Sequence, residues 1–295
     1  VLNKNSVTST ISSGPLGITA IGRPFINANT AAAGTFLVAA PNVTPGTAGD
    51  VGSATGFSTS QLWTAEINLL FNLYRDEFWT WNAMIGFRHF DLAEVIQVNS
   101  TSTQGPAGSP PYFFLGAALA PGQIETISDR FGTQNRFYGG NLGTEVEYRY
   151  HRITIDVRND AAIGSMRSTV DIVGTTTATT AAGVPLAGSP ANGGLLALPT
   201  NIGGRIQNNF SVVEQPGILV GYQFTRGLKF AVGYDFIYAF NVARPGLQID
   251  PGINPNLQPS SATFGAPGGT ARPAPLFALT DYWAQGVNFS LTARY

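Results

Sequence analysis

The chain has 295 residues, a net charge of −1 and no cysteine, and only 11% of its residues are charged. An ordinary soluble domain carries about 25% charged residues, so the composition is unusual for that class. The near-neutral charge gives no reason to expect a nucleic-acid partner, and the lack of cysteine excludes disulfides, thiol nucleophiles and zinc–thiolate sites.

The chain also lacks any apolar run near the ~18 to 20 residues of a membrane helix, and its 35 Gly and 19 Pro argue against long helices. A charge-poor chain without a spanning helix predicts a closed membrane β-barrel, in which every backbone polar group is paired between strands. The sequence opens on Val1 without a signal segment. Either such a segment was removed or the sequence begins inside a longer protein.

Residues 1–60 are rich in Thr, Ser, Ala, Gly and Asn. This composition predicts an extended, loop-rich N-terminal segment with weak strands, and disorder is the competing interpretation.

A clear hairpin follows in the segment 62–88. Apolar residues occupy alternate positions from Leu62 to Tyr74, a tight reversal follows at Arg75 and Asp76, and the alternation resumes at Trp79. Aromatic residues gather in membrane barrels where strands meet the membrane surface. The aromatic residues beside this reversal therefore indicate one rim of a barrel.

Further strands are expected at 135–150, 153–174, 210–224, 228–240 and 281–295. Short reversals near 75, 151 and 226 alternate with long Gly- and Pro-rich connections near 98–134, 175–207 and 244–280. Short turns at one end and long loops at the other are typical of an outer-membrane meander. We therefore expect residues 61–295 to form the strands of an all-β, antiparallel, up-and-down transmembrane β-barrel of the bacterial outer-membrane type.

The segment 228–240 (LKFAVGYDFIYAF) is the clearest strand. Every second residue is large and apolar or aromatic, while the residues between are small or charged except for Ile237. A soluble sheet would usually carry Thr, Lys and Glu on its polar face rather than Gly and Ala. The last strand repeats the alternation and ends on Tyr295, which resembles the C-terminal signature of bacterial outer-membrane barrels.

Several stretches resemble a planctomycete outer-membrane β-barrel family, catalogued as barrel-protein family seven of that phylum. The resemblance runs in order from about Arg23 to the C-terminus and includes IGFRHFDLAE (85–94), NRFYGGNLG (135–143), GGLLALPTNIG (193–203), VGYDFIYAFNVARPGLQID (232–250) and YWAQGVNFSLTARY (282–295). It implies a barrel in the bacterial outer membrane and little about activity. Members of the family carry further N-terminal strands, so either residues 1–60 supply the missing strands or this is the C-terminal part of a larger barrel. About 8–12 strands are expected for the complete protein.

The alternation assigns side chains to two faces. The charges expected to face the lumen are Glu66, Arg88, Glu145, Glu147, Arg149, Asp156, Arg158, Lys229, Asp235 and Arg294. The residues expected in the aromatic belt and on the lipid face are Trp63, Tyr74, Trp79, Trp81, Tyr148, Tyr150, Tyr222, Phe230, Tyr234, Phe236, Tyr238, Trp283, Phe289 and Tyr295. In a soluble protein the same charged residues would lie on a solvated face.

Three functions fit this arrangement. The favoured one is a structural or assembly role at the cell surface, with the charges paired across a packed lumen; the alternative is a general diffusion porin with weak ion selectivity. A ligand-binding or adhesive barrel is the third. The expected partners are the lipid bilayer of the outer membrane and, through the long loops, a second copy or a surface protein.

Catalysis has little support in the sequence. His89 and His151 are the only histidines and are placed on an outward or rim position and in a turn, so they are not expected to share a site. No Walker loop, HExxH or calcium-loop motif is present. We therefore expect no enzyme activity, no cofactor and no metal site.

Overall fold

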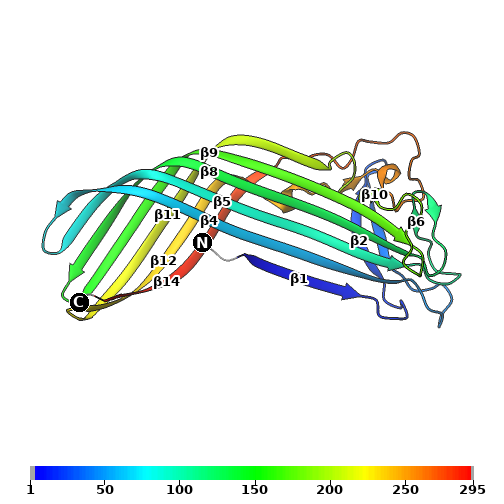
Figure 1. Cartoon of the computed structure of the whole chain (residues 1–295), viewed down its shortest axis with the longest axis horizontal. Coiled ribbons are helices and arrows are strands. Elements are labelled where there is room, and N and C mark those ends of the chain that lie inside the picture. Colours follow the sequence, from blue (N-terminus) through cyan, green and yellow to red (C-terminus); the bar gives the residue numbers. More distant parts are fainter. Residues whose placement is uncertain (1–3, 294–295) are drawn as a thin grey trace.

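The computed structural model describes residues 4–293, which form a long, curved, antiparallel sheet with folded loops at one end (Figure 1). The main path has the order β1-β4-β5-β8-β9-β11-β12-β14, and a short strand, β10 (Ala191–Asn192), pairs with β9. The strands of the main path are β1 (Asn5–Ser12), β4 (Val51–Arg75), β5 (Trp79–Thr103), β8 (Ile124–Tyr150), β9 (Ile153–Thr179), β11 (Gly203–Thr225), β12 (Leu228–Ala243) and β14 (Leu279–Ala293). The fold is thus all-β and built from successive antiparallel neighbours.

The tight turns at one end of the sheet are stabilised locally. In the β4–β5 turn, the Asp76 carboxylate accepts hydrogen bonds from the backbone N–H groups of Phe78 (2.8 Å) and Trp79 (2.6 Å). The β8–β9 turn is made by His151, with φ of 54°, and Arg152. We call this end the short-turn end and the opposite one the long-loop end.

The strands extend further towards the long-loop end than the sequence predicts. The connection expected at 98–134 is confined to 104–123, because β5 continues to Thr103 and β8 begins at Ile124. The one expected at 175–207 spans 180–202, and the third spans 244–278. These strand extensions are rich in Thr, Ser and Gly, so they lack the apolar alternation that identifies a half-buried strand.

The loops and the N-terminal segment fold together at the long-loop end. β2 (Ile21–Asn27) and β3 (Ala32–Ala39) form a hairpin, and β13 (Gly252–Ile253) joins it in parallel. β6 (Phe113–Phe114) pairs with β7 (Ala117–Ala118). Two short 3₁₀ helices, η1 (Pro245–Gln248) and η2 (Pro255–Leu257), lie in the third loop. None of the helices in the part of the chain that the structure describes is long and apolar enough to cross a membrane.

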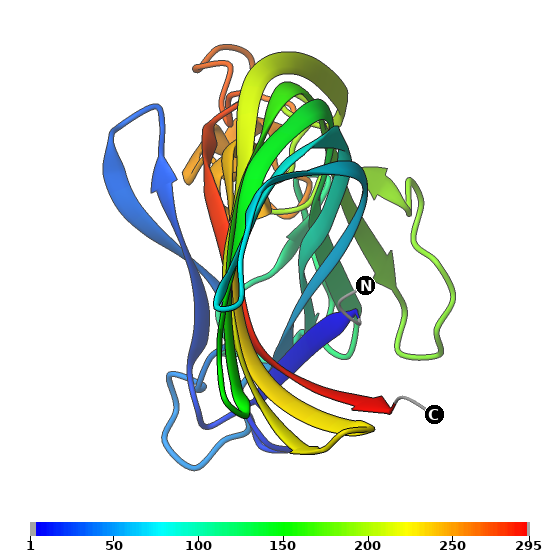
Figure 2. The same cartoon turned by 90° about the vertical axis from the view of Figure 1, so that its left-hand side faces the viewer.

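The sheet is curled but not closed, which corrects the expectation of a closed barrel (Figure 2). Within residues 4–293, β14 pairs only with β12, and β1 pairs with β4 only along Ser53–Ser60. The remaining edge of β4, residues 61–75, therefore has no strand beside it on that side. Because six antiparallel steps separate β4 from β14, these two strands run in the same direction, and they cannot close the sheet as antiparallel neighbours.

Candidate functional site on the concave face of the sheet

Nine of the ten charges expected to face a lumen lie on the concave face of the curled sheet. On each strand they occupy the same set of alternate positions as the buried apolar residues of that face. They are Glu66, Arg88, Glu145, Glu147, Arg149, Asp156, Arg158, Lys229 and Asp235. Arg294 lies outside the described residues.

Four of the concave-face side chains form one ion-pair network. Arg88 is fully buried and binds both Glu66 and Asp160, while Arg158 binds Glu66 and donates from Nε to Asp160 Oδ1 at 3.0 Å. Two positive and two negative charges cancel, as burial requires. Asp160, which was missing from the expected set, is central to the network. Asp160 follows Arg158 by two residues and Asp156 by four, so all three side chains lie on the same face of the strand. The alternation of the sequence could therefore have assigned Asp160 to the concave face.

Small residues make room for polar bonds that cross a strand. Gly86 on β5 lies between Asn68 of β4 and Asn141 of β8 in the strand register. A Cβ at Gly86 would lie 2.2 Å from the Asn68 amide oxygen. Because that space is open, Asn141 donates to Asn68 across β5 at 2.9 Å. The polar layer therefore continues across three strands.

An apolar layer fills the concave face next to this network. It contains Leu62, Phe90, Leu92, Phe137, Ala162, Met166, Val213, Ile237, Ala239 and Val242. Tyr282 of β14 packs against it, with its ring centroid 6.3 Å from that of Phe90 on β5. Side chains from distant strands thus meet across the interior of the curl.

The segment 193–202 fills the interior at the long-loop end. The Asp129 carboxylate accepts hydrogen bonds from the backbone N–H groups of Leu195, Leu196 and Ala197 at 2.8–3.0 Å, and it pairs with Arg23 at 2.5 Å. The side chains of Leu195 and Leu198 are buried against Ile127 and Ile253. This part of the connection expected at 175–207 is therefore an internal element.

The third loop is fixed to the same interior. The Asn135 side chain donates to the Ala243 carbonyl and accepts from its N–H, both at 2.8 Å. Next along the chain, Arg244 binds both oxygens of Glu94 at 2.5 and 2.9 Å. The loop also buries Asp250, whose pKa is raised by desolvation but brought below its usual range by hydrogen bonds from Ala274, Arg272 and Gly252.

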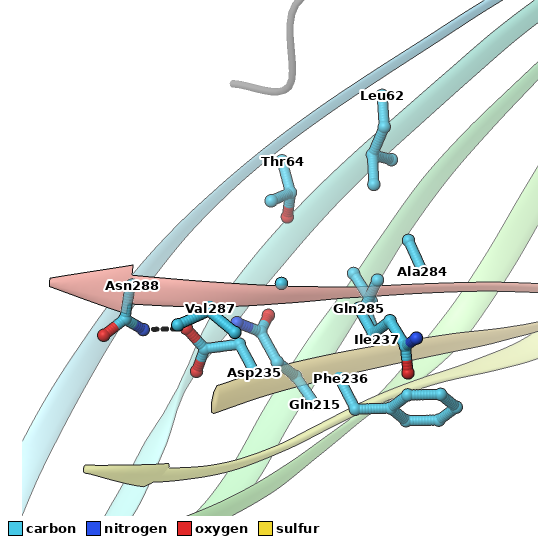
Figure 3. A pocket seen from close by; sticks show the side chains of 11 residues that line it. Leu62, Thr64, Gln215, Asp235, Phe236, Ile237, Ala284, Gln285, Val287 and Asn288 are labelled. Atoms are coloured by element: carbon cyan, nitrogen blue, oxygen red, sulfur yellow. Dashed lines mark hydrogen bonds between the residues drawn. The ribbon is translucent and has the colours of Figure 1, made fainter. Parts of the chain in front are cut away.

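Two cavities on the concave side lie at the seam and near the short-turn end, besides one of about 380 Å³ beside Glu94 and Arg244. One, of about 310 Å³, lies at the open seam, where Leu62 and Thr64 of β4 face side chains of β12 and β14 (Figure 3). Asn288 donates a hydrogen bond to Asp235 at its edge. The other, of about 350 Å³, lies near the short-turn end. Its lining is polar and comprises Asn72, Arg75, Thr80, Asn82, Glu145, Glu147, Arg149 and Asp156.

The convex face carries the expected aromatic residues. Trp63, Tyr74, Trp79, Trp81, Tyr148, Tyr150, Tyr222, Phe230, Tyr234, Phe236, Tyr238, Trp283 and Phe289 lie on the face opposite to the apolar layer, all exposed or half-buried. Tyr295 lies outside the described residues. Exposed apolar side chains are numerous on this face, for example Ile67 (73% exposed) and Phe289 (70%). Such a surface is far more apolar than that of a water-soluble monomer.

His89 lies on the convex face, where its ring stacks on Tyr138, and its Nδ1 contacts the Phe137 carbonyl at 2.9 Å. Among residues 4–293, no group of three or more His, Asp or Glu side chains is arranged to hold a metal ion. The sheet thus has an apolar outer face and an inner face that carries the ion pairs around Arg88.

These features define an all-β protein built as an antiparallel meander, with a charged and packed inner face and an apolar, aromatic outer face. The family model described as "Putative beta barrel porin-7 (BBP7)" matches residues 2–295, and the chain belongs to this family. Comparisons with curated proteins and with solved structures gave no significant match.

Proposed function

We propose that the protein is embedded in the bacterial outer membrane and has a structural or assembly role at the cell surface, with an interior closed to solutes. The apolar layer that meets across the concave face is the observation that supports this proposal most directly. The alternative suggested by the family description is a general diffusion porin.

The height of the apolar band supports a membrane setting. On β5 the outward side chains run from Trp79 to His89 without a charge, and the next one is Asp91. At ~3.4 Å per residue and a tilt of ~40°, these ten steps span about 26 Å along the membrane normal, close to the ~25 Å apolar band of outer-membrane barrels. The aromatic residues at the short-turn end would then lie at one membrane surface.

Three successive layers support a closed interior. From the short-turn end, these are the ion pairs around Arg88, the apolar layer around Phe90, and the segment 193–202 held by Asp129. A diffusion pore needs a continuous polar path, and the apolar layer opposes such a path across the strands that contribute to it. The ordered loops instead offer a surface for a second copy or another surface protein.

A specific observation favours the porin alternative at the short-turn end. The cavity near Arg149 is lined by charged and amide side chains, as expected of a pore vestibule. A pore would need the layers around Phe90 and Asp129 to separate.

Single-channel conductance in a planar bilayer distinguishes the two functions. We expect no stable current steps from the correctly folded wild-type protein. The matched test of a pore is Arg149→Glu, because Arg149 is 42% exposed and its reversal leaves the buried network intact. Stable steps whose ion preference changes with Arg149→Glu would establish a porin and refute the closed interior.

A further inference from the structure

Two arginines lie directly opposite each other on the convex face. In the β8–β9 register Arg136 pairs with Arg167, and both side chains are exposed. Like charges at directly opposed positions of a sheet destabilise it. The pair therefore favours an anion bound between the two guanidinium groups.

The neighbouring carboxylate only partly compensates this charge. Asp91 contacts the Arg136 Nε at 3.3 Å and also accepts from Gln134. Within the described residues Arg167 makes no ion pair, whereas Arg130, further along β8, has Asp171 at 2.8 Å. One uncompensated positive charge thus remains at the pair.

The arginine pair lies at the boundary of the apolar band. Two residues from Arg136 towards the short-turn end, Tyr138 stacks on His89 with ring centroids 4.6 Å apart. The His89 and Trp63 ring centroids are 4.8 Å apart. Rows of Trp and Tyr mark the level of lipid headgroups. The two guanidinium groups therefore lie where headgroup phosphates would be found.

Gly140, four residues from Arg136 on β8, leaves a gap among the apolar side chains of the convex face. At Gly140 an added Cβ would meet no atom within 4 Å. The side chains beside Gly140 are Tyr138 and Leu142 on the same strand and Ile163 opposite, each about half exposed. A gap with these apolar neighbours suits contact with a lipid acyl chain.

We propose that Arg136 and Arg167 bind the headgroup phosphate of an anionic lipid, whose acyl chain contacts the apolar side chains beside Gly140. The arginine fork matches phosphate oxygens with two parallel hydrogen bonds. This inference rests on the proposed membrane location.

The test reconstitutes the full chain into phosphatidylcholine vesicles with and without a minor fraction of phosphatidic acid, and measures the midpoint of heat-induced unfolding. The anionic lipid should raise the wild-type midpoint by about 5 °C. The Arg136→Gln/Arg167→Gln variant should lose most of this rise, and Gly140→Leu should reduce it without any change of charge. The control Arg130→Gln/Arg205→Gln, which removes equal charge at the same end of the sheet, should keep it.

An equal loss in the control, or an undiminished rise in the Arg136→Gln/Arg167→Gln variant, would overturn the lipid site. The same rise produced by inorganic phosphate in neutral vesicles would also overturn it, because the ligand would then be a soluble anion. If the wild-type chain inserted into neither vesicle, the proposed function itself would fail. Normal insertion with no response to phosphatidic acid would refute the lipid site alone.

Discussion

Replacement of Arg88 by methionine should be among the most destabilising single changes in the protein. The Arg88 side chain is 0% exposed and binds two carboxylates, of which Asp160 is also 0% exposed. Removal of one member of a buried ion pair typically costs 3–5 kcal/mol. Because Arg158 still reaches both carboxylates, we expect a loss near the lower limit, about 3 kcal/mol in the free energy of unfolding.

Two companion variants isolate the cause. Arg158 is 33% exposed, so solvent screens its pairs, and Arg158→Gln should cost only about 1 kcal/mol. Arg88→Met combined with Asp160→Leu removes one charge of each sign, and it should recover part of the loss because an apolar replacement of a buried pair is often neutral. The assay is urea unfolding in detergent micelles, followed by tryptophan fluorescence. The reasoning would be refuted if Arg88→Met cost no more than Arg158→Gln, or if the double variant were less stable than Arg88→Met.

Three further predictions concern other parts of the molecule. Val232→Arg on the convex face should lower the free energy of unfolding in a bilayer by ~2–4 kcal/mol, whereas Asn288→Arg, beside Asp235 on the concave face, should lower it much less. Equal losses of stability would contradict the assignment of Val232 to the lipid and of Asn288 to the interior. Asp129→Asn keeps the shape of the side chain but removes the charge that binds three N–H groups and Arg23. Amide hydrogen exchange in 193–202 should therefore accelerate at least tenfold. Unchanged exchange would show that other contacts than those of Asp129 hold this segment in place. Burial raises the pKa of Glu125 well above its usual range, so the folded state keeps a proton that the unfolded chain releases above about pH 4.3, and the stability of the wild type falls as pH rises from there. Glu125→Gln should therefore be as stable as the wild type at pH 4 and more stable at pH 8 by about 1 kcal/mol or more. An equal difference in stability at both pH values would contradict this linkage.

The part of the fold that could be predicted from sequence is the part with an apolar convex face. The strands around Trp79, Tyr148 and Phe230 were identified because large apolar side chains alternate with small or charged ones, and their turns are short. In the extensions of the same strands, such as NSTST at 99–103 and TTTAT at 175–179, both faces carry small polar residues. Their strand structure depends on pairing with neighbours and on loops packed beneath them, which a local pattern does not record.

The same limit applies to the interior. The Arg88–Glu66 pair joins adjacent strands at directly opposed positions, so strand alternation was sufficient to place both residues on one face. The partners of Asp129 lie in a loop 66–68 residues away and in β2, and no local signal connects them. The expectation of a closed barrel was wrong for a related reason. The number of strands does not reveal that β1 pairs with only part of β4.

In the proposed membrane location, the length of the strands determines how far the loops stand from the lipid. On β5, thirteen residues from Asp91 to Thr103 continue beyond the apolar band, which at ~3.4 Å per residue gives about 44 Å of strand. With the long-loop end directed out of the cell, this extension would stand beyond the membrane, and the loops packed inside it fill its hollow. The outermost loops would then stand clear of the lipid headgroups, within reach of whatever layer covers the membrane.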